Sequence, residues 1–146
     1  MRYRPPGSAR PGRRATAVAE LAVLLPFLCF AFVAALDFGR VFYFSLTVTN
    51  CARNGALYGS ASTTQALDTS GIQTAAQRDA SNLTLTQLHV NSSTDSKNGS
   101  SPTTVTVTVT YPFSTITGYT FPGVTGAMTL TRTVQMKVVP ATPNFS

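Results

Sequence analysis

Apolar residues follow two different patterns along the chain, and these patterns divide it into two parts. No residue from Leu21 to Leu36 carries a charge, and Glu20 is the only charged residue between Ala15 and Leu36. A helix of that window is about 33 Å long, which is enough to cross the hydrocarbon core of a bilayer. Beyond residue 100, apolar and polar residues alternate one by one, which is typical of strands. The sequence therefore predicts an α+β fold that begins with a transmembrane helix.

The predicted helix continues past the membrane to about residue 60. Apolar residues there recur at steps of three and four, which places them on one helical face: Phe38, Val41, Phe42, Val48, Ala52 and Ala56. The two halves together form one helix of about forty residues, half in lipid and half in water. Pro26 predicts a kink, because it lacks the amide that would bond the carbonyl of Ala22.

Residues 61–146 are expected to form a small polar domain, in which Ser and Thr make up 30 of 86 residues. A short helix is predicted from Ile72 to about Ser81, and a loop over residues 91–102. Strands are predicted at Leu83 to Val90, Thr103 to Tyr111 and Met128 to Val138, which form a small antiparallel sheet of about three strands. Arg132 interrupts the apolar face of the last strand, so we expect it near a sheet edge or at an interface. The water-exposed half of the long helix is the available cover for this sheet.

The net charge of +6 comes almost entirely from the N-terminal end of the chain. Five arginines lie among the first fourteen residues, and the remainder carries a net charge of +1. This distribution argues against a nucleic-acid partner and indicates a basic cytoplasmic tail over residues 1–14. We therefore expect a transmembrane helix at 15–36, its extracytoplasmic continuation at 37–60, and a Thr/Ser-rich α+β domain at 61–146 outside the cytoplasm.

The chain carries few residues that are suited to catalysis. His89 is the single histidine, the aspartates are scattered, and the sequence contains no metal-ligand spacing, phosphate loop or nucleophile motif. We therefore predict a protein that is not an enzyme and that uses no cofactor or metal. Cys29 and Cys51 would lie about 33 Å apart on a continuous helix and could not pair with each other. We expect Cys51 to be partly buried, and a disulfide between subunits through Cys51 is the alternative.

Glu20 is the one residue whose position has an energetic cost. A carboxylate inside the hydrocarbon region costs about 2 to 3 kcal/mol, and less near the interface, so it normally has a partner. Two interpretations remain open: Glu20 lies among the headgroups close to Arg13 and Arg14, or a cation of another subunit neutralises it. The segment after Leu36 is a poor site for signal-peptide cleavage, so we expect the helix to remain in the product.

Four blocks stand out in the N-terminal region. They are an arginine pair, Glu20 before an apolar run with Leu25-Pro26, the stretch Asp37-Phe38-Gly39-Arg40, and the stretch Thr49-Asn50-Cys51-Ala52-Arg53-Asn54-Gly55-Ala56. In order and spacing these blocks resemble the TadE-like family, the minor pilin-like proteins (pseudopilins) of the bacterial tight-adherence pilus. The later strands resemble the family's C-terminal part more loosely.

The resemblance implies a structural component of a pilus assembly or secretion system, held in the bacterial inner membrane by a single span. Its implied partners are other pilus or pseudopilin subunits, the assembly machinery and a prepilin peptidase. That peptidase would cut between Ala15 and Thr16, so that Glu20 becomes the fifth residue of the mature chain and the new amine of Thr16 serves as a cation for Glu20 of a neighbouring subunit. The resemblance also implies helix-packing roles for Pro26, Asp37, Gly39, Arg40, Arg53 and Gly55. The alternative function is a membrane-tethered extracytoplasmic binding or adhesion module that does not assemble.

Overall fold

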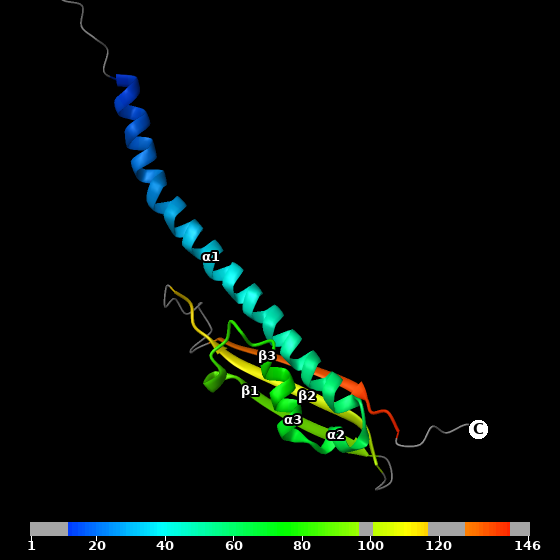
Figure 1. Cartoon of the computed structure of the whole chain (residues 1–146). Coiled ribbons are helices and arrows are strands. Elements are labelled where there is room, and N and C mark those ends of the chain that lie inside the picture. The colour runs from blue at the N-terminus through cyan, green and yellow to red at the C-terminus, as the bar shows by residue number, and fades with distance from the viewer. Residues whose placement is uncertain (1–11, 97–100, 117–127, 141–146) are drawn as a thin grey trace, which may run out of the picture. The chain divides into compact units, whose positions relative to one another are not determined.

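The computed structural model describes residues 12–96, 101–116 and 128–140. Its elements are the helices α1 (Gly12–Ser60), α2 (Thr63–Leu67) and α3 (Thr69–Gln77), a short 3-10 helix at Leu85–Gln87, and the strands β1 (His89–Ser96), β2 (Pro102–Phe113) and β3 (Met128–Lys137) (Figure 1). The predicted α+β class is confirmed. The chain divides into two compact units, Met1–Asp37 and Phe38–Ser146, which we call the N-terminal unit and the C-terminal unit.

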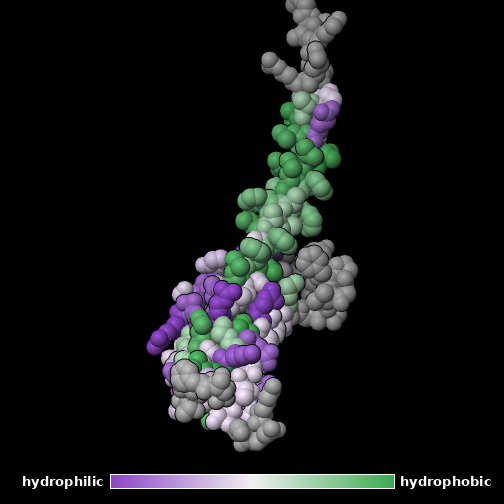
Figure 2. Space-filling view, turned by 90° about the vertical axis from the view of Figure 1, so that its right-hand side faces the viewer, coloured by the Kyte–Doolittle hydropathy of each residue, from purple (hydrophilic) through white to green (hydrophobic). Residues whose placement is uncertain are grey.

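The described residues of the N-terminal unit form the first part of α1, a helix that is long and apolar enough to cross a membrane. Its large apolar side chains are exposed, for example Val23 at 79%. Figure 2 shows these hydrophobic side chains in green along the helix, whereas the C-terminal unit is mostly white and purple. α1 contains 49 residues and runs through Pro26, so it is longer than the sequence predicts. An apolar surface of this kind needs a non-aqueous environment or a protein partner.

The C-terminal unit is built around a three-stranded antiparallel sheet with β2 in the centre. Alternate residues of β2 point to opposite faces. One face is apolar and buried: Val105, Val107, Val109, Tyr111 and Phe113. The other carries threonines, of which Thr108 and Thr110 lie opposite Thr133 and Thr131 of β3. The strand that the Val/Thr alternation predicts is therefore confirmed and extends two residues further, to Phe113.

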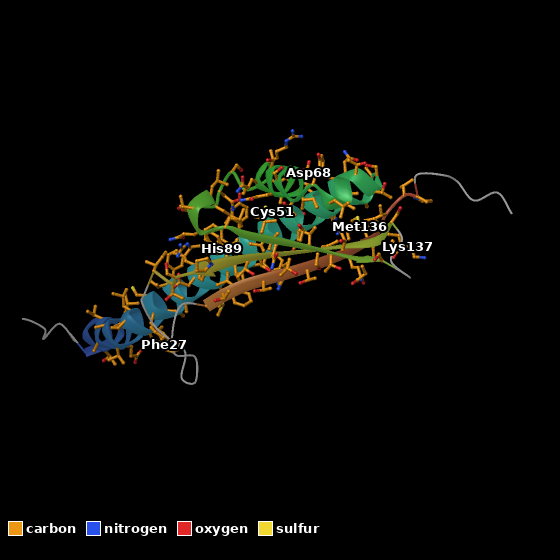
Figure 3. The ribbon with its side chains drawn as sticks, turned by 90° about the horizontal axis from the view of Figure 1, so that it is seen from below. Phe27, Cys51, Asp68, His89, Met136 and Lys137 are labelled. Atoms are coloured by element: carbon orange, nitrogen blue, oxygen red, sulfur yellow. The ribbon has the colours of Figure 1, made fainter. Side chains whose placement is uncertain are left out.

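Helices cover only the apolar face of this sheet (Figures 1 and 3). The C-terminal part of α1 contributes Val48, Cys51, Ala52 and Ala56 to the core, and α3 contributes Ile72 and Ala76. The prediction that the second half of the long helix covers the sheet is therefore confirmed.

Two aromatic residues of α1 do not take part in this core, although the sequence predicts that they do. Phe38 and Phe42 are 76% and 62% exposed. Phe44 packs instead, with ring centroids 6.0 Å from Tyr111 and 5.4 Å from Phe113. Residues two positions apart differ by about 160° around a helix, so a helix that turns Phe44 toward the sheet turns Phe42 away from it.

The first strand and the second helix lie elsewhere than the sequence predicts. Strand β1 occupies His89–Ser96, most of which the composition assigns to a loop, while the expected strand at Leu83 to Val90 is largely a 3-10 helix and coil. Pairing with β2 overrides the weak strand propensity of the Asn, Ser and Asp residues. Helix α3 begins at Thr69, because Asp68 caps it by accepting a hydrogen bond from the amide of Gly71.

Candidate assembly site

Glu20 lies on one face of α1 with five uncharged residues. A shallow hollow on the N-terminal unit is lined by Glu20 together with Thr16, Ala19, Val23, Leu24 and Phe27. This face follows from the helical spacing, since residues three, four and seven positions apart are neighbours on a helix. Figure 3 shows Phe27 on the N-terminal part of α1. The surface therefore combines one carboxylate with apolar groups that could pack against another helix.

No residue one helical turn from Glu20 can neutralise it. The positions three and four residues away hold Thr16, Ala17, Val23 and Leu24, none of which carries a charge. Ion pairs along a helix form at these spacings. The adjacent turns of α1 therefore supply no counter-charge for this carboxylate.

The predicted cleavage point lies near the start of α1. Ala15 is the fourth residue of the helix and Thr16 the fifth. The first four amides of a helix have no partner within it, so opening of this end costs little hydrogen bonding.

The residues with implied helix-packing roles have different environments. Pro26 lies inside α1, and Asp37 is buried. Arg53 is exposed. Gly39 faces open space, since a Cβ atom placed there would meet nothing within 4 Å. The structure does not bring these residues together into a single cluster with Glu20.

Arg40 and Gly55 contact the core of the C-terminal unit. The guanidinium carbon of Arg40 lies 5.8 Å from the ring centroid of Phe44 and 5.2 Å from that of Phe113. These distances are typical of cation–π contacts. A Cβ atom on Gly55 would lie 3.2 Å from Val107 Cγ1. Gly55 therefore allows α1 to approach the sheet closely.

Gly59 has the same role one turn later, and the sequence analysis does not identify it. A Cβ atom there would lie 3.1 Å from both Ile72 Cδ1 and Val105 Cγ2. The spacing of Gly55 and Gly59 by four residues is the signal that could have identified this contact, because small residues at this spacing let a helix approach its neighbour.

Residues 15–57 match the family model of TadE-like proteins. The resemblance that the sequence motifs suggest is thereby confirmed for this segment, which contains Glu20, Gly55 and most of α1. No curated protein and no solved structure matches the chain. We call residues 15–57 the TadE-like segment.

A hydrogen-bonded cluster around Asp68 holds the end of α1 to α2 and α3, just beyond the TadE-like segment. The Asp68 carboxylate accepts hydrogen bonds from Ser70 Oγ at 2.6 Å, from the Gly71 amide at 2.9 Å and from the Tyr58 hydroxyl at 2.8 Å. The bonds from Ser70, Gly71 and Tyr58 lower the pKa of Asp68 to about 2. The Asp68 bond raises the pKa of Tyr58. Because each of these hydrogen bonds joins two residues of the fold, we assign the cluster a role in stabilising the C-terminal unit.

Cys51, within the TadE-like segment, is fully buried and packs in the core (Figure 3). Burial, and next the negative charge of Asp79, raise the pKa of the Cys51 thiol to about 11. Among the residues that the structure describes, no three His, Cys, Asp or Glu side chains are arranged to hold a metal ion.

Proposed function

We propose that this chain is a minor pseudopilin-like subunit of a tight-adherence pilus assembly, without enzymatic activity. In this proposal α1 anchors it in the bacterial inner membrane as a single span, with the N-terminus in the cytoplasm and the C-terminal unit outside. The observation that carries the proposal is the match of residues 15–57 to the TadE-like family, which includes the apolar helix and Glu20. The basic residues among the first fourteen support the orientation.

In the assembly, Glu20 pairs with a cation of a neighbouring subunit. A carboxylate inside the hydrocarbon region costs about 2 to 3 kcal/mol, and less near the interface, and a partner in lipid recovers part of this cost because water does not screen the pair. A prepilin peptidase that cuts between Ala15 and Thr16 would create the required amine at Thr16. The uncharged surroundings of Glu20 on its own helix support a partner from a second molecule.

The test compares Glu20→Gln with Glu20→Asp in the full chain. Glu20→Gln removes the charge and keeps the shape, so we expect equal membrane insertion but much less incorporation into complexes extracted from the membrane. A lost pair of about 2 kcal/mol corresponds to about a 30-fold decrease in incorporation. Glu20→Asp keeps the charge and should retain most of the incorporation. Equal incorporation of Glu20→Gln and the parent chain would refute the role of the charge.

One observation favours the alternative function, a tethered adhesion module that does not assemble. The outward face of the sheet is rich in threonine, and hydroxyl pairs span it: Thr108 with Thr133 at 3.0 Å, and Thr110 with Thr131 at 3.4 Å. Such a surface offers donors and acceptors to a polar partner. Co-purification from membranes distinguishes the two functions, since a tethered module should recover no component of the pilus machinery, whereas a pseudopilin should recover several.

A further inference from the structure

An exposed apolar face lies on the first turns of the C-terminal unit. Its members are Phe38, Phe42 and Tyr43, which are 76%, 62% and 59% exposed, and Leu46, which is 50% exposed. Residues at these spacings share one side of a helix. Single exposed apolar residues are ordinary, but a contiguous aromatic face indicates a contact. We call Phe38, Phe42 and Tyr43 the aromatic collar.

The height of the collar along α1 matches the headgroup layer of a membrane. Thr16 to Leu36 spans about 31 Å as a helix, which equals the thickness of a bilayer hydrocarbon core. Phe38 then lies about 3 Å beyond Leu36 and Phe42 about 9 Å beyond it. The headgroup region on each side is about 5 to 8 Å thick. Long side chains on a helix point back toward its N-terminus, so the rings of the collar lie closer to Leu36 than these backbone positions and reach this layer. Tyrosine, the residue type of Tyr43, is enriched there.

The fold leaves no spacer between this layer and the C-terminal unit. Val41 and Phe44 already pack against the core, so the folded unit begins within two turns of Leu36. Arg40 adds a positive charge at the same height, beside Phe44 and Phe113.

We propose that the aromatic collar inserts into the headgroup layer of the outer leaflet and seats the C-terminal unit directly on the membrane surface. The occupant of this face is thus lipid. The inference rests on the proposed membrane span, but goes beyond it, because a span alone does not require that a folded unit contact the lipid.

The chain contains no tryptophan, so single tryptophans can report the depth of chosen positions. The test uses full-length Phe27→Trp, Phe42→Trp and Leu57→Trp chains in vesicles whose phospholipids carry bromine either near the headgroup or near the end of the acyl chain. The side chains at these positions are exposed, Phe27 at 65%, Phe42 at 62% and Leu57 at 52%, so each position can accept the larger ring of tryptophan. Leu57 is the matched control, since it lies about 22 Å further along α1 than Phe42.

We expect shallow bromine to quench Phe42→Trp about two-fold or more, deep bromine to quench Phe27→Trp more strongly, and neither to quench Leu57→Trp. If Phe27→Trp is not quenched, the membrane span itself is wrong. If Phe27→Trp is quenched and Phe42→Trp is not, the span stands and the collar assignment is wrong. In that case, a blue-shifted emission of Phe42→Trp would show that the ring is still in an apolar environment. If this emission shifts to the red when more lipid dilutes the protein, a second copy of the chain covers the face. Equal quenching of all three variants would also overturn the assignment.

Discussion

The close approach of α1 to the sheet at Gly55 leads to a quantitative prediction for Gly55→Val. A Cβ atom at Gly55 already lies 3.2 Å from Val107 Cγ1, 3.3 Å from Ala76 Cβ and 3.3 Å from the carbonyl oxygen of Ile72. The two methyl groups of valine extend further and cannot fit unless α1 moves. Overpacking of this kind costs about 1 to 3 kcal/mol. Valine recovers only a few tenths of a kcal/mol from its better helix propensity.

We therefore expect Gly55→Val to destabilise the C-terminal unit by about 1 to 3 kcal/mol, and each kcal/mol lowers the melting temperature of a domain of this size by about 4 to 8 °C. The assay is thermal unfolding of the detergent-solubilised full chain, followed by circular dichroism. Gly39→Val on the same helix is the control, because nothing lies within 4 Å of a Cβ atom at Gly39. Equal melting temperatures for the two variants would refute the assigned packing.

Three further predictions follow from individual side chains. Hydrogen bonds lower the pKa of Asp68 from 3.8 to about 2, so the stabilisation that they give is present above pH 4 and is lost as the pH falls toward 2. Acid unfolding of Asp68→Asn should lack this part of the pH dependence. Cys51 is buried with a raised pKa, so maleimide at pH 8 should label it only after denaturation, and Cys51→Ser should leave non-reducing electrophoretic mobility unchanged. Arg132→Val should increase self-association on size-exclusion chromatography, whereas Arg132→Lys should not, because an inward-pointing charge on an edge strand prevents strand pairing.

The sequence predicts the elements whose pattern depends on a single strong period. The Val/Thr alternation identifies β2. The break in the apolar face at Arg132 predicts a place near a sheet edge or at an interface, and in the structure Arg132 lies on the edge strand β3 and donates a hydrogen bond to Ser45 of α1 at 2.6 Å. Both follow from side-chain alternation, which fixes the faces of a strand without knowledge of its partners.

The parts that the sequence does not predict depend on tertiary contacts. The polar residues of β1 form a strand because they pair with β2. Phe42 is exposed because the face of α1 that packs on the sheet is the one that carries Phe44. Of the candidate site, the position of Glu20 on an apolar helical face could be predicted. The spacing of Gly55 and Gly59 could mark a close approach of α1, but it could not show that Gly59 meets Ile72 and Val105, because these residues lie on elements distant in sequence.

The central claim is that the apolar helix stays in the mature protein and presents Glu20 within the membrane. Mass spectrometry of the chain purified from the membrane fraction tests this claim most directly. The account predicts a membrane-bound chain whose first residue is Thr16, with the whole stretch to Leu36 retained. A soluble exported chain that begins beyond Leu36 would contradict it.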